Sequence, residues 1–230
     1  MRSRLRRHLL PGAGLVLVAG VALTGCGDVS PGAAATVDGE SIALSQVDEI
    51  ARSVCNAEMS YSDYNDSEWQ PLPTSYYRDN VLGVLINERL ATMAADELGL
   101  DVPSSLSQPP DNEDLDAIFA RLEGDDETAF RDYLAAFGRL QALYYAIGQD
   151  QGGDKASDGQ AATSAGQAYV AKYADEQDVE LDPRFGDFTG GQVIGGSGSL
   201  SVPLEPTATT VPPPGTPEDV SDLPDSQICQ

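Results

Sequence analysis

Two long amphipathic stretches constrain the fold of this chain more than any other feature of its sequence. Both repeat apolar side chains every three or four positions, which is the spacing that one face of an α-helix requires. Shorter stretches of the same kind predict three further helices, so we expect a mainly α fold in which the helices share one core. The expected elements are helices over 45–55, 75–98, 111–122, 127–148 and 164–176, with loops at 56–74 and 149–159.

Two short β-forming segments lie at opposite ends of the helical region. Residues 35–42 hold β-forming side chains on both sides of an Asp-Gly dipeptide, which is typical of tight hairpin turns. The first residues of the segment 179–188 alternate like a strand. Apart from the short hairpin arm, neither segment has a strand beside it in the sequence, and an isolated two-stranded unit is marginal in water. We therefore expect the two ends to pair, with Val37 and Val179 in one small sheet.

The first 26 residues have the layout of an export signal. A basic head over residues 1–8 precedes an apolar run that is too short for a stable transmembrane helix, which needs about 20 residues. The small residues before Cys26 resemble the lipobox of bacterial lipoproteins. This resemblance implies that residues 1–25 are removed and that Cys26 is acylated on its sulfur and at the new N-terminus. Because two or more acyl chains anchor a protein stably, the expected location is the extracytoplasmic face of the cell membrane. The alternative is an ordinary secreted protein with a cysteine near its cleavage site.

Composition argues against several classes of function. Removing four of the 13 basic residues with the leader leaves nine against 37 acidic ones, a formal net charge of −28. Nucleic acid is therefore not an expected partner, because binding it depends on Lys and Arg side chains that displace counterions from phosphates. The single histidine, His8, leaves with the leader, so the mature chain has no imidazole for catalysis or metal binding. No cofactor is expected, and the acidic residues are too numerous for any pair of them to indicate a catalytic site.

The two remaining cysteines predict a disulfide. Once Cys26 is committed to lipid, Cys55 and Cys229 are left in an oxidising compartment that favours pairing. Closing a loop of more than 100 residues removes on the order of 5 kcal/mol of conformational entropy from the unfolded chain. We expect an intramolecular Cys55–Cys229 bridge that folds the C-terminal tail back onto the first helix. Two free or intermolecular thiols are the alternative.

The chain divides into a leader, a spacer, one folded domain and a tail. Residues 26–34 are small and polar, and residues 35–190 are about 155 residues, enough for one modest core. Within that domain, residues 149–163 form a short linker. Residues 191–230 are rich in Gly, Pro and Thr, and from residue 201 onward they contain seven prolines and no basic residue, a composition typical of disorder.

The order of these elements resembles the chaperone domain of the SurA/PrsA/trigger-factor group. A strand reading Val-Asp-Gly-Glu-x-Ile precedes a helix that opens Ser-x-x-Asp with Ser45 as its cap, and a late strand ends Asp-Pro-Arg-Phe-Gly. The resemblance covers most of residues 35–188. It implies a multi-helix, SurA N-terminal-like domain with a small β element that pairs its N- and C-terminal strands. The matching residues are Val37, Asp38, Gly39, Glu40, Ile42, Ser45, Asp48 and residues 182–186.

In that group, a parvulin prolyl isomerase domain can be inserted between the last two helices. Here the slot holds only residues 149–163, which is far too short for a catalytic domain. Parvulin sites also rely on histidines, which the mature chain lacks. We therefore expect a protein that is not an enzyme and has no prolyl isomerase activity.

The resemblance implies a membrane-anchored, extracytoplasmic chaperone-like lipoprotein that binds unfolded or partly folded exported polypeptides. Such a protein needs exposed apolar surface in a cradle between helical arms. Aromatic residues at helical spacing more often form core, and that interpretation stays open for each candidate, although Tyr76 and Tyr145 lie off the main stripes. The alternative function is a non-catalytic adaptor or scaffold for one specific cell-envelope partner. The candidate client-binding residues are Tyr76, Tyr77, Phe130, Tyr133, Phe137, Tyr144 and Tyr145.

Overall fold

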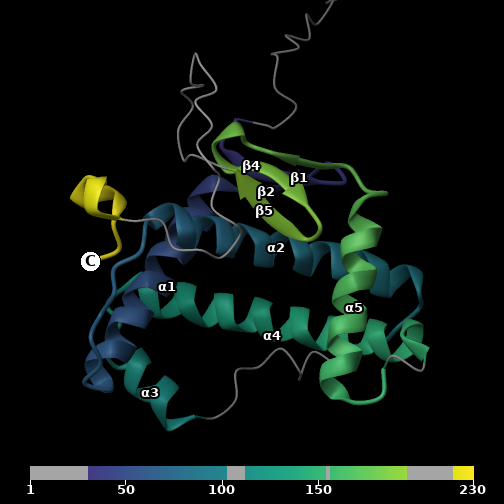
Figure 1. Cartoon of the computed structure of the whole chain (residues 1–230), viewed down its shortest axis with the longest axis horizontal. Helices are drawn as coiled ribbons and strands as arrows, with labels where there is room; N and C mark the ends of the chain where they lie inside the picture. Colours follow the sequence, from purple (N-terminus) through teal and green to yellow (C-terminus); the bar gives the residue numbers. More distant parts are fainter. Residues whose placement is uncertain (1–30, 103–111, 154–155, 196–219) are drawn as a thin grey trace, which may run out of the picture.

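Five α-helices make up most of the described structure, with two small β elements on one side of them (Figure 1). The computed structural model describes residues 31–102, 112–153, 156–195 and 220–230. The expected mainly α fold class, with a small antiparallel sheet, is confirmed. The helices are α1 (Leu44–Tyr64), α2 (Thr74–Glu97), α3 (Glu113–Phe119), α4 (Asp125–Gln151) and α5 (Gly159–Ala174), and the strands are β1 (Ala33–Val37), β2 (Glu40–Ala43), β3 (Val179–Leu181), β4 (Gly186–Thr189) and β5 (Gln192–Gly195).

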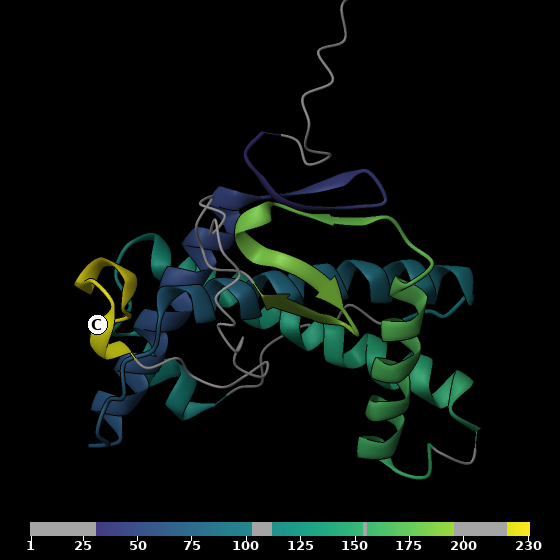
Figure 2. The same cartoon turned by 45° about the horizontal axis from the view of Figure 1, so that its top comes forward.

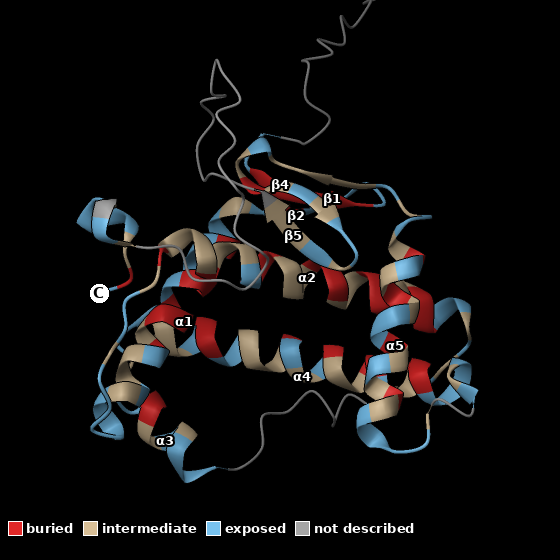
Figure 3. Ribbon diagram, in the orientation of Figure 1, coloured by how far each residue is buried: buried red, intermediate tan, exposed pale blue. Residues whose placement is uncertain are grey.

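The two longest helices, α2 and α4, lie side by side and form the centre of the body (Figure 1). α1 packs on both of them, α5 crosses the C-terminal part of α4, and the strands lie along α2 (Figures 1 and 2). The apolar stripes meet in one core, which includes Leu82 and Ile86 of α2 and Leu140 and Ile147 of α4. The buried positions follow the inward faces of the helices, as the periodicity predicted (Figure 3).

Small residues let α4 and α5 cross at close range. A Cβ atom added to Gly148 would collide with the carbonyl oxygen of Ala162, and one added to Gly166 would collide with that of Tyr144. Both glycines are buried. This contact fixes α5 against the body and thereby positions the chain that continues into β3.

The three-stranded sheet joins the two ends of the domain. β1 lies in the middle, with β2 antiparallel on one side and β3 antiparallel on the other. Val37 is the partner of Val179, so the expected pairing of remote segments is confirmed. Asp38 and Gly39 both have positive φ angles in the β1–β2 turn, which is the conformation that a two-residue hairpin prefers. Every residue of β1 is buried, because the strand also packs on α1 and α2.

α1 differs from its prediction at both ends. It begins at Leu44, so Ser45 lies inside the first turn and does not cap the helix. It continues to Tyr64, so the loop expected at 56–74 is wrong in its first half. The added turns contact α3, and the Arg121 guanidinium lies 5.2 Å from the centre of the Tyr64 ring. These tertiary contacts outweigh the low helix propensity of the Ser, Asp and Asn residues there.

The connection between α4 and α5 is shorter than the expected linker at 149–163. α4 continues to Gln151, and α5 already begins at Gly159. The Asp158 side chain caps α5 by accepting a hydrogen bond from the Ala161 N–H at 2.9 Å. A side-chain cap followed by alanines favours an earlier start of the helix. Both boundaries expected for the linker, residues 149 and 163, are therefore wrong.

Two parts of the C-terminal region, residues 191–195 and 220–230, are described. The expectation of a disordered tail is wrong for both of them. β4 and β5 form an antiparallel hairpin around a Gly-Gly turn. Asn87 Nδ2 of α2 donates a hydrogen bond of 2.8 Å to the Gly191 carbonyl, which fixes that turn on the helix. Residues 220–230 form two 3-10 turns and a final segment that packs on the loop before α2. Residues 196–219 lie outside the described part of the chain.

Candidate functional site

Three of the predicted client-binding aromatics belong to the core. Tyr77, Phe130 and Tyr144 are only 2%, 8% and 6% exposed, so their prediction as client-contacting surface is wrong. Phe130 packs against Phe119 with ring centroids 5.8 Å apart. The apolar stripes of the helices carry these rings inward, and the interpretation as core, left open by the sequence, is correct for them.

The other candidates reach the surface to different degrees. Tyr145 and Phe137 are exposed, at 46% and 41%. Tyr76 and Tyr133 are half-buried: Tyr76 lies edge-on to the ring of Tyr77, and Tyr133 stacks on Phe137 with centroids 6.4 Å apart. The structure therefore does not gather the predicted aromatics into one continuous cradle.

Burial keeps the tyrosine hydroxyls of this core protonated. Burial raises the pKa of Tyr77, and the hydrogen bond of 2.7 Å that its hydroxyl donates to Glu58 raises it further. Burial alone raises the pKa of Tyr144 to about 12, and burial is also the main cause that raises the pKa of Tyr133. None of the three shifts provides a phenolate at neutral pH, so these groups have structural roles.

One cysteine of the helical domain and one cysteine of the C-terminal tail form a disulfide. Cys55 of α1 and Cys229 are joined with their Cα atoms 5.9 Å apart, which is the pairing that the sequence favoured. Cys229 is 1% exposed, its N–H donates to the Leu72 carbonyl at 2.9 Å, and its own carbonyl accepts a hydrogen bond from Trp69 Nε1 at 3.3 Å. A β-bridge between Pro73 and the residue before Cys229 adds to these contacts. The last residues of the chain are therefore built into the body. Cys26, the predicted acylation site, lies outside the described residues.

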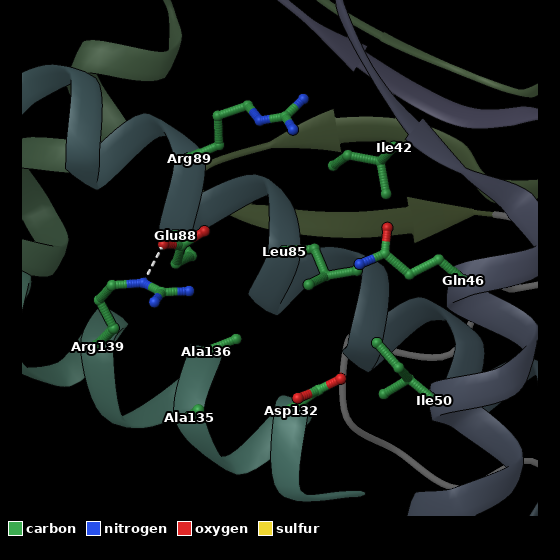
Figure 4. A pocket seen from close by; sticks show the side chains of 10 residues that line it. All are labelled: Ile42, Gln46, Ile50, Leu85, Glu88, Arg89, Asp132, Ala135, Ala136 and Arg139. Atoms are coloured by element: carbon green, nitrogen blue, oxygen red, sulfur yellow. Dashed lines mark hydrogen bonds and ion pairs between the residues drawn. The ribbon is translucent and has the colours of Figure 1, made fainter. Parts of the chain in front are cut away.

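A cleft of about 340 Å³ opens between β2, α1, α2 and α4 (Figure 4). Its floor is apolar and is made by branched side chains from three elements and by two alanines of α4. Its rim is polar and carries two arginines. The lining residues are Ile42, Gln46, Ile50, Leu85, Glu88, Arg89, Asp132, Ala135, Ala136 and Arg139.

Ion pairs hold most of the charges on this rim. Arg139 of α4 pairs with Glu88 of α2 and so bridges the two helices across the cleft (Figure 4). Arg89 donates a hydrogen bond of 2.8 Å to the Glu40 carbonyl and lies 3.7 Å from its carboxylate. The cleft can therefore hold an apolar group on its floor and a polar group at its edge.

None of the cleft residues was predicted from the sequence as a binding residue. They come from four elements that only the fold brings together. A partial signal exists, since Glu88, Arg89 and Arg139 flank the apolar stripes of their helices, where charged side chains border the core. Such positions are ordinary on amphipathic helices, so the signal alone does not define a site.

No family model, curated protein or solved structure matches this chain. Within the described ranges, no group of three or more His, Cys, Asp or Glu side chains is placed to hold a metal ion. None of the described helices is long and apolar enough to cross a membrane.

Proposed function

We propose that this protein is a lipid-anchored, extracytoplasmic chaperone-like lipoprotein that binds short segments of unfolded or partly folded exported polypeptides. The proposal places the lipid anchor on Cys26 and the client segment in the cleft between β2, α1, α2 and α4. It includes the finer description of the fold as a SurA N-terminal-like domain.

The cleft is the observation that carries this proposal. Its volume lies at the lower end of the range for ligand pockets, roughly 300–1,000 Å³, which suits one or two side chains of an extended chain. The half-buried Leu85 and Ala135 offer apolar contacts to the side chains that an unfolded segment exposes, and the buried Ile42 and Ile50 complete the apolar lining. Tyr145 and Phe137 on α4 add exposed apolar area outside the cleft.

The pairing of remote strands supports the finer description of the fold. A domain closed by β1 and β3 leaves the α4–α5 connection free to carry an insertion without breaking the core. In this chain that connection runs only from Gly152 to Asp158. We therefore propose that the protein binds clients without isomerising their prolines and is not an enzyme.

The test is suppression of aggregation. A reduced secretory client is allowed to aggregate with and without a fragment of residues 27–230, and light scattering is followed. Ala135→Leu places added volume in the cleft and should abolish suppression, whereas Ala168→Leu, on the exposed face of α5, should leave it intact. Absence of suppression by the unmodified fragment at stoichiometric excess would count against the proposal.

One observation favours the alternative function, an adaptor or scaffold for a single cell-envelope partner. In the described part of the chain the exposed large hydrophobic residues are four aromatics on two helices, Tyr61, Tyr64, Phe137 and Tyr145, which is little area for promiscuous binding. Pull-down from membranes separates the two functions. One protein bound saturably supports the adaptor, and many weakly bound exported proteins support the chaperone.

A further inference from the structure

The two acidic and two basic side chains that line the cleft are not all paired with one another. The two cations of the lining are both engaged, because Arg139 pairs with Glu88 and Arg89 with Glu40. Asp132 remains. It lies on the exposed side of α4, and within the described residues its carboxylate has neither an ion pair nor a hydrogen bond.

The Asp132 carboxylate lies beside the apolar floor. Figure 4 shows Asp132 below Leu85, with one carboxylate oxygen turned toward Ile50 and the other toward the side of Ala135. A side chain seated on Leu85 and Ala135 would therefore have Asp132 as the unpaired charge of the lining. A cation beside that side chain would gain an ion pair, and an anion would meet a like charge.

We propose that the cleft selects polypeptide segments in which a branched apolar side chain has a Lys or Arg as its neighbour. The apolar side chain lies on the half-buried Leu85 and Ala135, with the buried Ile42 and Ile50 behind them, and the basic side chain pairs with Asp132. This inference rests on the proposed function, since it names the class of segment that the client-binding cleft accepts.

The charge of the whole chain acts in the same direction but cannot by itself give this selectivity. A chain with 37 acidic residues attracts any basic peptide over long distances. The local effect of Asp132 must therefore be separated from the general field. Asp150 offers the matched control: it lies on the same helix, five turns or about 27 Å further along, is exposed, and does not line the cleft.

The experiment measures binding of three labelled nine-residue peptides by fluorescence anisotropy. Each has one central Leu, flanked by Lys in the first peptide, by Gln in the second and by Glu in the third. The full lipoprotein is held in phosphatidylcholine nanodiscs, and empty nanodiscs are the blank. Because an exposed ion pair changes affinity by a few-fold, and a like charge by a similar factor in the opposite sense, the Lys peptide should bind about tenfold more tightly than the Glu peptide.

The variants separate a local site from the general field. Asp132→Lys should reverse the order of the Lys and Glu peptides. Asp132→Asn should reduce the discrimination to the smaller preference that the general field gives, while leaving binding of the Gln peptide unaffected. Asp150→Lys, which makes the same change in net charge, should keep the wild-type order. Equal effects of Asp132→Lys and Asp150→Lys, or equal binding of all three peptides, would overturn the inference. If aggregation is still suppressed in that case, the chaperone proposal stands without this selectivity, whereas loss of both suppression and peptide binding removes both.

Discussion

Reduction of the Cys55–Cys229 disulfide should destabilise the whole domain. The bridge closes a loop of 174 residues. In the chain-entropy model, a cross-link over that length removes about 5 kcal/mol of conformational free energy from the unfolded state. A domain of this size changes its melting temperature by about 2–4 °C per kcal/mol. The oxidised protein should therefore melt about 10–20 °C above the reduced one.

The chain supplies its own local reporter for this experiment. Trp69 is the only tryptophan, and its Nε1 donates to the Cys229 carbonyl at 3.3 Å. Release of the C-terminal segment should change the Trp69 emission, while far-UV circular dichroism follows the helices. Reduced wild-type protein keeps the Cys55 and Cys229 side chains. The comparison of oxidised with reduced wild type therefore separates the effect of the cross-link from any loss of packing.

The Cys55→Ala/Cys229→Ala double variant is the control. Its melting temperature should lie below that of the oxidised wild type and should not change when a reductant is added. A wild-type melting temperature that falls by less than about 2 °C, after complete appearance of two thiols, would refute the reasoning. The cross-link would then contribute less than the chain-entropy model gives, and the C-terminal segment would be held by its other contacts, among them those with Trp69, Leu72 and Pro73.

Three further predictions concern the packing of the core. Gly166→Ala drives a methyl group into the carbonyl oxygen of Tyr144 and should cost about 1–3 kcal/mol or more in urea unfolding, whereas the same change in an unhindered helix stabilises. The melting temperature should fall between about pH 10 and pH 12. The folded-state pKa values of Tyr144 and Tyr173 are raised to about 12, while unfolded tyrosines ionise near 10, so the stability that these groups contribute is fully present below pH 10 and is lost as the pH rises. Tyr173→Phe, which removes a hydroxyl bonded to Glu97, should make that decline shallower. Phe185→Ala empties a site that is 1% exposed and should cost about 3–5 kcal/mol, and a loss below 1 kcal/mol would show that the ring does not fill the core.

Helical periodicity could be read from the sequence because it depends on local pattern. The stripe over 75–98 predicts α2 to within one residue at each end, since its apolar spacing and its good helix formers agree. The pairing of β1 with β3 followed from the lack of any nearer partner apart from the short hairpin arm. The end of α1 could not be read in the same way, because its last turns are polar and depend on contacts with α3.

The β4–β5 hairpin was missed although its signal is present. A Gly-Gly dipeptide lies between Phe188 and Val193, and two such residues between short alternating runs predict a hairpin. The glycine-rich surroundings hid this pattern. The aromatic candidates failed for another reason: periodicity identifies the inward face of a helix, but it does not tell whether a ring on that face meets a neighbouring helix or an open cleft.

The cleft could not be predicted from any single segment. Ile42, Leu85 and Asp132 come from elements far apart in the chain, and each is ordinary within its own helix or strand. Only the crossing of α1 over α2 and α4, together with the edge position of β2, brings them to one opening.

The Asp-Pro-Arg-Phe-Gly motif of residues 182–186, one of the two motifs on which the proposed chaperone-like fold rests, has a packing role. Asp182 accepts hydrogen bonds from the backbone N–H and the guanidinium of Arg184, which fixes the turn between β3 and β4. That turn drives Phe185 into the core beneath Arg78, whose guanidinium lies 5.1 Å from the ring centre and pairs with Asp48 of α1. The motif therefore ties the late strands to α1 and α2 and closes the domain. Since none of its residues lines the cleft, changes to the motif should alter stability, and changes to the cleft should alter the choice of client.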